Sequence, residues 1–276
     1  MPGKTDSLYD LPQNEVAKLV TDQWFEYLSF MGSSPRARLD VKPDCTRMTT
    51  GIPHRVLNCV FKMRLEGTPG TDERLGKIVR SYKEQRLPAS FYTDPDAKPE
   101  DLGGRLGRIG LRYNHDRPGM AADLQLADLA RASPEGLRIT RVSDLAELMT
   151  YMSVLTESLE FPMAVEEPRY QLEAALGVGP QLRRMHFLGL LNGIPVATAT
   201  LFLGSGAAGI YNVGTLHRSR RRGIGAAMTL AAMRTAKAAG YRTAVLQSSS
   251  EALAMFEKLG FETVCKYGVY VYDGKA

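Results

Sequence analysis

Residues 55 to 67, RVLNCVFKMRLEG, alternate between apolar side chains and mostly polar ones. A period of two places every second side chain on the same face of a β-strand. The pattern therefore predicts a strand with one buried face. Its apolar positions are Leu57, Cys59, Phe61, Met63 and Leu65.

Other segments carry helical spacing, with apolar residues three and four positions apart. Strands between them begin or end at proline, glycine or a capping residue. Helices are predicted over 21–30, 72–85, 99–110, 145–155, 168–176 and 226–240, and strands over 87–92 and 137–142. From residue 137 onward the predicted order is a strand, two helices, three strands, a helix, a strand, a helix and two strands.

The three consecutive strands come from a segment that could be mistaken for a membrane helix. Phe187 to Leu216 contains no charged residue and exceeds the roughly 20 apolar residues that span a bilayer. However, Asn192-Gly193 is a strong hairpin signal, Pro195 follows it, and glycines interrupt the remainder. We therefore expect three buried strands with tight turns and no membrane association.

The length of 276 residues accommodates two domains of about 100–150 residues each. Between them, the segment 121–135 predicts a short leucine-rich helix followed by the loop-forming run Ala-Ser-Pro-Glu-Gly. We predict an N-terminal arm over 1–20, a first domain over 21–122, a linker over 123–136 and a second domain over 137–276.

Composition narrows the class of protein further. The three cysteines, Cys45, Cys59 and Cys265, are far apart and odd in number, so they support neither a disulfide framework nor a zinc site. We therefore expect no bound metal. The first residues carry no apolar run typical of a secretory signal, which favours a cytoplasmic location. The net charge of +5 indicates anionic ligands without requiring nucleic acid.

The segment 209–240 carries the candidate chemistry. A predicted strand ends near Leu216, an arginine-rich turn contains Gly223 and Gly225, and an alanine-rich helix follows. Glycines let the backbone approach a bulky anion, and the start of a helix offers unpaired N–H groups with partial positive charge. This combination predicts a phosphate-binding turn. A dinucleotide-binding turn would need G-x-G-x-x-G after a strand, which is absent.

The spacing Arg220-x-x-Gly223-x-Gly225 resembles the R/Q-x-x-G-x-G/A motif of the GCN5-related N-acetyltransferase (GNAT) superfamily. The later segment SSSEALAMFEKLGFETV resembles the next motif of that superfamily, and the resemblance covers about 137–276. The first domain is similar to the degenerate N-terminal half of tandem GNAT proteins. The resemblance implies an α/β (α+β layered) fold of two GNAT-like domains, each with a mixed, mostly antiparallel central sheet flanked by helices.

The resemblance also implies an acetyl-CoA site in the second domain. The first domain has no such motif in its loop over residues 66–71, so it is expected to bind no acetyl-CoA. The implied cofactor-binding residues are Val213, Gly214, Thr215, Arg220, Arg221, Arg222, Gly223, Ile224, Gly225, Ala226, Ser249 and Phe256.

The implied activity is transfer of an acetyl group from acetyl-CoA to a primary amine, by direct attack in a ternary complex. The acceptor would be a small molecule or a protein amine. The sequence departs from the family at the positions that commonly carry the acid, the asparagine near the pantetheine and the basic glutamates, which are Phe256, Ser249, Gly209 and Ala244.

Substitutes for these catalytic groups are Glu160 as a general base and Ser249 as a hydrogen-bonding group near the sulfur. Glu157, Glu166 and Glu167 are interpreted as solvated surface carboxylates, and His186 as a core histidine with satisfied hydrogen bonds.

Two alternatives remain from the sequence. The missing acid and base favour an acetyl-CoA sensor without turnover. The run Arg218, Arg220, Arg221 and Arg222 is also typical of a nucleic-acid-binding module.

Overall fold

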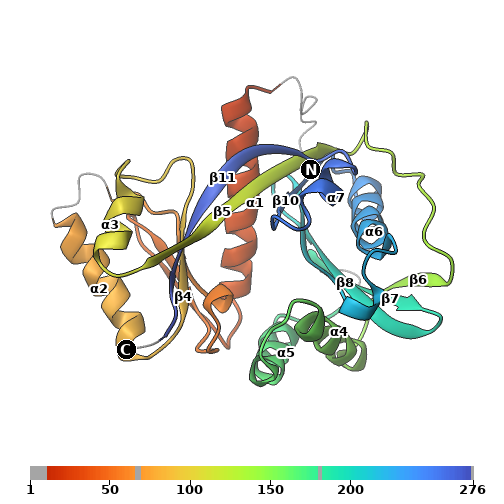
Figure 1. Ribbon diagram of the computed structural model, residues 1–276, viewed down its shortest axis with the longest axis horizontal. Helices are drawn as coiled ribbons and strands as arrows, with labels where there is room; N and C mark the ends of the chain where they lie inside the picture. The colour runs from red at the N-terminus through yellow and green to blue at the C-terminus, as the bar shows by residue number, and fades with distance from the viewer. Residues whose placement is uncertain (1–10, 66–69, 180–181, 275–276) are drawn as a thin grey trace. The chain divides into compact units, whose positions relative to one another are not determined.

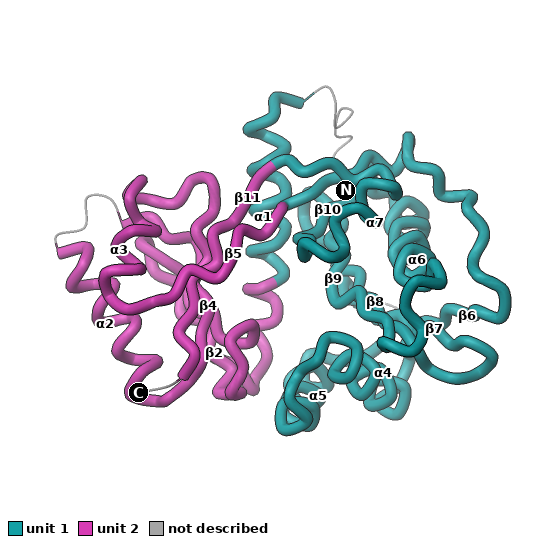
Figure 2. The backbone as a smooth tube through the Cα atoms, viewed as in Figure 1, with its two compact units in different colours: residues 1–27, 119–264 teal, residues 28–118, 265–276 magenta. Residues whose placement is uncertain are grey.

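The computed structural model describes residues 11–65, 70–179 and 182–274. These residues form two compact units (Figure 2). Unit 1 contains residues 1–27 and 119–264, and unit 2 contains residues 28–118 and 265–276. The units thus differ from the predicted domains 21–122 and 137–276. Residues 21–27 and 119–122 of the predicted first domain belong to unit 1, and residues 265–276 of the predicted second domain belong to unit 2.

The exchange has a physical cause in each case. Within unit 1, Gln23 on the first helix donates from Nε2 to the carbonyl oxygen of Phe202 at 3.0 Å, and Ser205 donates from its backbone N–H to the Glu26 carboxylate at 2.9 Å. Within unit 2, the end of the last strand pairs antiparallel with residues 89–93. In the described part of the predicted arm, the first helix, α1, begins at Gln13.

Unit 2 packs helices on a small sheet with the order β1-β2-β3-β4-β11. Its elements, some of which continue into unit 1, are α1 (Gln13–Gly32), β1 (Arg38–Val41), β2 (Thr46–Thr49), η2 (Arg55–Leu57), β3 (Asn58–Phe61), α2 (Thr71–Glu84), β4 (Ala89–Thr93), α3 (Leu102–Arg108), β5 (Arg112–Asp123) and β11 (Glu262–Tyr272) (Figure 1). The predicted stripe of α2 is confirmed, since Leu75, Ile78, Val79 and Tyr82 are buried.

The strand predicted over 55–67 is wrong in length and in having one buried face, although the five apolar positions predicted to be buried are buried. Only residues 58–61 form β3, and all four are buried. Asn58 is fully buried because its side chain bonds to the backbone at several points, including the carbonyl oxygen of Ile52 at 2.8 Å and that of Pro88 at 3.0 Å. Lys62 then adopts a left-handed φ of 53°, which ends the extended run.

Unit 1 has a sheet with the order β5-β10-β9-β8-β7-β6. Its elements beyond those shared with unit 2 are β6 (Leu137–Arg141), α4 (Leu145–Ser158), η3 (Met163–Val165), α5 (Glu166–Ala175), β7 (Arg184–Leu191), β8 (Ile194–Leu203), β9 (Ala208–Thr215), η4 (His217–Ser219), α6 (Ile224–Ala238), β10 (Thr243–Gln247) and α7 (Leu253–Glu257) (Figure 1). The three predicted consecutive strands are thus confirmed as β7, β8 and β9. None of the helices formed by the described residues is long and apolar enough to cross a bilayer.

Two predictions about this half of the chain are wrong. The segment 123–136 contains no helix, because Arg234 of α6 donates to the carbonyl oxygens of Leu129 and Arg131, both at 2.7 Å, and so replaces intrahelical bonds. The chain also ends in one strand, not two. Gly268 lies inside β11, where a side chain would overlap the hydroxyl of Thr93, so this glycine permits close packing and is not a turn.

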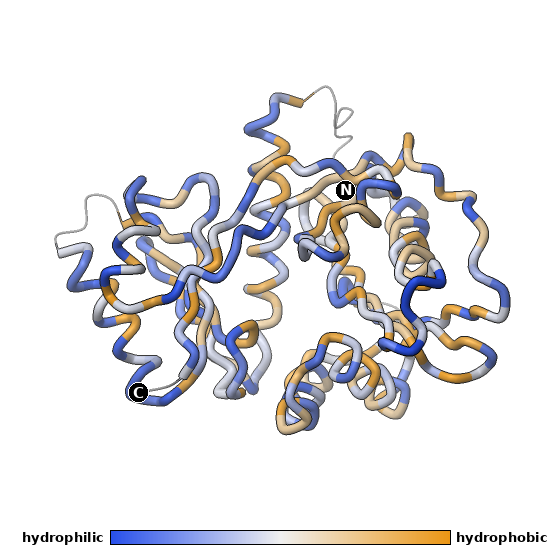
Figure 3. The backbone as a smooth tube through the Cα atoms, in the orientation of Figure 1, coloured by the Kyte–Doolittle hydropathy of each residue, from blue (hydrophilic) through white to orange (hydrophobic). Residues whose placement is uncertain are grey.

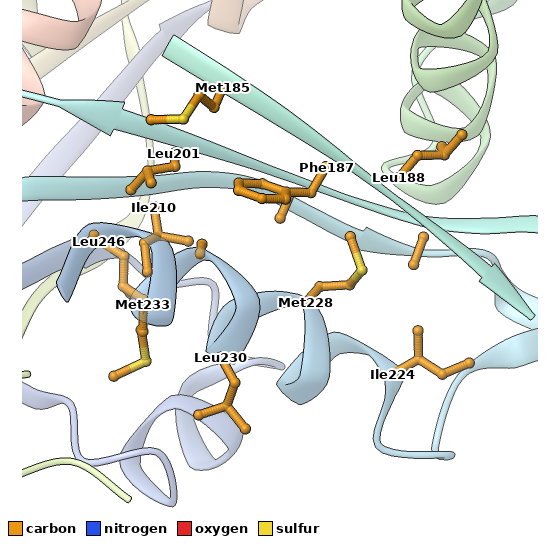
Figure 4. Close-up of a cluster of buried hydrophobic side chains, with 14 of the residues drawn as sticks. Met185, Phe187, Leu188, Leu201, Ile210, Ile224, Met228, Leu230, Met233 and Leu246 are labelled. Carbon is orange, nitrogen blue, oxygen red and sulfur yellow. The ribbon is translucent and has the colours of Figure 1, made fainter. Parts of the chain in front are cut away.

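The sheet of unit 1 is covered on both faces by its own helices. Figure 4 shows side chains of α6, including Met228 and Met233, packed against Phe187, Leu201 and Ile210 of the strands. Alternate residues of β7 and β8 face the other way, where Tyr151 of α4 contacts Thr200 and His186. Two opposite packed faces hold β8 and β9 in fixed positions.

Helix α4, predicted from residue 145, begins at a cap formed by Ser143 and Asp144. The Asp144 carboxylate accepts from the backbone N–H of Glu147 at 2.8 Å, and the Glu147 carboxylate accepts in return from the backbone N–H of Ser143 at 2.7 Å. This reciprocal arrangement is a capping box, which satisfies N–H groups that the helix itself cannot bond. It fixes the start of the helix whose other end, Ser158, contacts β9.

Candidate functional site

The turn before α6 presents unpaired backbone N–H groups. Gly223 precedes the helix with a φ of 74°, a left-handed conformation that favours glycine. The first bond of the helix runs from the N–H of Ala227 to the carbonyl oxygen of Gly223 at 3.0 Å. The N–H groups of residues 224–226 therefore precede the helical ladder, at the positive end of the helix dipole. Such a terminus binds phosphate groups.

Two arginines of this turn are exposed, and two others bond to protein groups. Arg221 and Arg222 are exposed, and the trace before α6 is drawn in deep blue in Figure 3 because the turn is strongly hydrophilic. Arg220 instead donates to the carbonyl oxygens of Thr215 and Ser158, at 3.1 and 3.0 Å. Arg218 pairs with Glu157 at 2.7 Å. Arg220 thus holds the turn against β9 and α4, and its predicted contact with phosphate remains a prediction.

Strands β9 and β10 separate next to this turn. They pair in parallel at Ala208 with Ala244 and at Gly209 with Val245, whereas β9 continues to Thr215. The predicted pantetheine-binding residues, Val213, Gly214 and Thr215, lie in the part of β9 beyond this pairing. A strand edge without a neighbour offers backbone N–H and C=O groups to an extended amide-containing ligand.

A β-bulge shapes the same part of β9. Thr198 faces Gly214, but Thr200 faces Tyr211, so β9 has one residue more than β8 in this interval. Asn212 lies in the interval with a φ of 53°, a conformation that asparagine tolerates better than most residues. At this bulge, the Asn212 side chain contacts Arg169 of α5 and Thr200 of β8.

Partly buried hydrogen bonds fix the Asn212 amide. Its Oδ1 accepts from Nη2 of Arg169 at 3.2 Å, and its Nδ2 donates to Oγ1 of Thr200 at 3.2 Å and to the hydroxyl of Tyr27 at 3.4 Å. Both amide hydrogens and the carbonyl oxygen therefore have partners, which determines how the amide is oriented. Burial raises the pKa of Tyr27 to about 12, so its hydroxyl remains protonated.

The Thr200 hydroxyl joins two further side chains to this network. It lies 2.6 Å from the hydroxyl of Tyr151 and 3.0 Å from Nδ1 of His186. If Thr200 accepts from Asn212 and Tyr151, its own hydrogen points to Nδ1, which places the imidazole proton on Nε2. Burial, and then the charges of Arg184 and Arg169, hold the pKa of His186 well below its usual value. His186 is thus neutral and lies in the core, as predicted. The prediction that its hydrogen bonds are satisfied is wrong, because Nε2 is buried without a hydrogen-bond partner among the described residues and lies 3.7 Å from the Glu173 carboxylate.

The charged members of this buried cluster are Arg169, Glu173 and Arg184. Arg184 forms an ion pair with Glu173 and also donates to the carbonyl oxygen of Gly177 at 2.8 Å. Sequence reasoning missed all three residues because it interpreted the carboxylates of this region as solvated. The spacing of Arg169 and Glu173, four residues apart on a helix that also buries Leu172, was the available signal.

The predicted catalytic residues lie at the surface. Glu160 has a left-handed φ of 56°, and its exposed carboxylate lies 3.7 Å from Nη2 of Arg220. Ser249 is exposed just beyond β10, and its carbonyl oxygen accepts from the hydroxyl of Ser248 at 2.7 Å. Phe256 is buried edge-on against Phe261, with ring centroids 5.8 Å apart.

Glycines also set how closely the site packs. A Cβ atom on Gly214 would overlap the Ser158 hydroxyl, and one on Gly225 would lie 3.2 Å from Sδ of Met255.

Residues 66–69 of the corresponding loop in the first domain lie outside the described residues, so the predicted absence of a second acetyl-CoA site stays a prediction.

The separated strands β9 and β10, the glycine turn and helix α6 all lie within the part of the chain that matches a known protein family. Residues 152–261 match the model of the acetyltransferase (GNAT) family. The predicted superfamily is therefore confirmed: over this region the chain carries a domain of the GCN5-related N-acetyltransferase superfamily. That family transfers acetyl groups and generally uses acetyl-CoA.

Solved structures show the same fold over most of the chain. A GCN5-related N-acetyltransferase from Kribbella flavida is 19% identical, with a TM-score of 0.69, over 94% of this chain and 96% of that one. A second, from Sphaerobacter thermophilus, is 16% identical, with a TM-score of 0.61, over 96% and 95%.

A tandem GNAT protein from the clavulanic acid biosynthesis pathway is 14% identical, with a TM-score of 0.58, over 96% and 98%. A comparison with curated proteins finds no match. The predicted fold class, mixed α/β with mostly antiparallel sheets and flanking helices, is confirmed.

Proposed function

We propose that this protein is an N-acetyltransferase that moves the acetyl group of acetyl-CoA to a primary amine in a ternary complex. The observation that carries the proposal is the open edge of β9 beside the glycine turn of α6. The two features supply what the cosubstrate needs, a strand edge for the pantetheine amides and a helix N-terminus for the pyrophosphate.

Acetyl-CoA supplies the acetyl group as a thioester. The backbone N–H groups from Arg221 to Ala226 would bind its pyrophosphate, and the backbone of Val213 to Thr215 would hold the pantetheine. The attacking amine must be neutral, so an ammonium acceptor first loses one proton to a base. The C–N bond then forms and the C–S bond breaks, and the leaving thiolate takes up the proton that the nitrogen releases and departs as the free thiol. Glu160 as base and Ser249 near the sulfur remain our proposals for these roles.

The proposal can be tested by calorimetric titration with acetyl-CoA. We expect one site in the wild type and its loss in Gly223→Trp, because the new side chain would fill the turn. Gly240→Trp is the matched control, since Gly240 follows the other end of α6 with a similar positive φ and would have open space around a Cβ atom. Absence of binding by the folded wild type would refute the proposal.

A sensor that binds acetyl-CoA without turnover is the second candidate. The observation in its favour is that Gly209 and Ala244, where the family commonly has glutamates, carry no acid or base, and that Phe256 is buried. An amine screen separates the two candidates, because a sensor binds acetyl-CoA but releases no free thiol with any acceptor.

A nucleic-acid-binding function has less support from the geometry. Arg218 and Arg220 are engaged with protein partners, so the run presents Arg221 and Arg222 to a polyanion. DNA binding that falls steeply with salt and survives Gly223→Trp would favour this function.

A further inference from the structure

The guanidinium group of Arg169 is buried with unused hydrogen-bond donors. The residue is 4% exposed, and only its Nη2 atom donates to a protein oxygen, that of Asn212. Among the residues that the structure describes, its Nε and Nη1 atoms have no hydrogen-bond partner and no solvent exposure. The Phe161 ring, 4.8 Å from the guanidinium carbon, covers one face of the group.

The charges around Arg169 do not cancel. Arg169 and Arg184 are both buried, and the single buried carboxylate beside them, Glu173, forms its ion pair with Arg184. Within the described residues, no carboxylate lies within 4.0 Å of a nitrogen of Arg169, including that of Glu166, three residues earlier on the same helix. His186 is neutral and adds no charge. Glu166 was interpreted as solvated, but its Oε2 atom is buried without a hydrogen-bond partner among the described residues. Because it is not paired with Arg169, the charge of Arg169 is the one positive charge in excess of the ion-paired groups.

An unpaired charge in a protein interior is costly, and natural proteins retain one where it has a function. A bound anion would remove this cost by accepting from the free nitrogens of Arg169. One excess positive charge matches a monoanion such as a carboxylate. A phosphate dianion would leave a buried negative charge instead.

The position of Arg169 relates this anion to the proposed reaction. Arg169 is bonded to Asn212, the bulge residue that immediately precedes the predicted pantetheine-binding residues 213–215. An anion held there lies beside the strand along which the acetyl group would be presented.

We propose that Arg169 binds a carboxylate of the acceptor, and that the acceptor is an amino acid or a peptide with a carboxylate near its amine. This inference rests on the proposed acetyltransferase function. Arg169 is then a residue that determines specificity, and Asn212 positions it.

The test compares each common L-amino acid that has a primary amine and no thiol with its primary amide as acceptor, with release of free thiol as the signal. For the preferred amino acid we expect kcat/KM to exceed that of the amide by about 10²-fold or more, because the amide leaves the buried charge unpaired. In Arg169→Met this ratio should fall to about 1, while the affinity for acetyl-CoA stays within about twofold.

Arg141→Met, which removes an exposed arginine on β6, is the control and should keep the wild-type ratio. Arg169→Lys keeps the charge and should retain part of the preference if Arg169→Met fails to fold. Equal rates for acids and amides in the wild type, or a preference that survives Arg169→Met, would overturn the proposal.

If no amine is acetylated, calorimetric titration with the same acids and amides decides. Carboxylate-dependent binding that Arg169→Met removes would uphold the anion site and show that the acetyltransferase function has failed. Equal or no binding of acids and amides would overturn the site itself.

Discussion

His186 makes the stability of unit 1 depend on pH. Its pKa in the folded protein lies well below the ordinary value of 6.5, mainly because of burial. As pH falls below about 6.5, the unfolded chain gains a proton that the folded chain does not, so the free energy of unfolding decreases by up to about 1.4 kcal/mol per pH unit. Above that pH, His186 does not make the free energy of unfolding depend on pH.

Urea unfolding between pH 7 and pH 5 measures this effect. Trp24, the single tryptophan, is buried in the part of α1 that belongs to unit 1 and reports on that unit by fluorescence. In His186→Gln, unfolding below pH 6.5 should take up about one proton fewer, so the free energy of unfolding should change less steeply with pH. Equal slopes in the two proteins would contradict the assignment of a neutral buried imidazole.

At the residue level, sequence reasoning found the glycines and arginines of the turn, because a local motif contains all the information needed. It missed Arg169, Glu173 and Arg184. The spacing of Arg169 and Glu173 places both on the helix face that carries Leu172, but it does not name their partners. One partner, Asn212, lies more than 40 residues from Arg169 in the chain.

At the level of elements, the contact between β9 and α4 depends on the absence of a side chain at Gly214. In Gly214→Val the new Cβ would overlap the hydroxyl of Ser158 and lie 3.2 Å from Oγ1 of Thr198, both in well-packed surroundings. We expect a loss of about 1–3 kcal/mol in the free energy of unfolding, the range for overpacking a core. Trp24 fluorescence in urea measures it.

The control for this prediction is Ala254→Val, which enlarges an exposed residue of α7 in the same unit. It should change stability by less than about 0.5 kcal/mol. A similar loss in both variants would show that β9 and α4 can separate easily and that Gly214 does not set their spacing.

The elements that were predicted well are α2, which has a strong period, and α4, which also has a clear cap at Asp144. The elements that were predicted wrongly are those whose limits depend on distant atoms. The segment after β5 remains non-helical because Arg234 bonds its carbonyl groups, and β11 continues through Gly268 because Thr93 lies against it.

At the scale of the whole molecule, we expect the predicted second domain, residues 137–276, not to fold alone. That fragment lacks residues 119–123 of β5, which pair with all five residues of β10, and it lacks the part of α1 that bonds to Phe202 and Ser205. Circular dichroism during heating should show no cooperative transition for the fragment. A sharp transition together with acetyl-CoA binding would contradict this expectation.

The two-motif resemblance predicted the superfamily, whose family model matches residues 152–261, and the fold class, which solved structures share over most of the chain. It could not predict how the terminal segments are distributed between the compact units. That distribution depends on contacts such as those of Gln23 and Glu26, which lie about 180 residues from their partners.

The open edge of β9 has a consequence for the lifetime of the protein. If acetyl-CoA occupies that edge, it acts as the missing strand and stabilises the folded state by about 2.7 kcal/mol when its concentration is 100 times its Kd. Proteases that attack transiently opened chains would then remove the protein faster whenever acetyl-CoA is scarce. The amount of protein would follow the supply of its own substrate without any separate regulator.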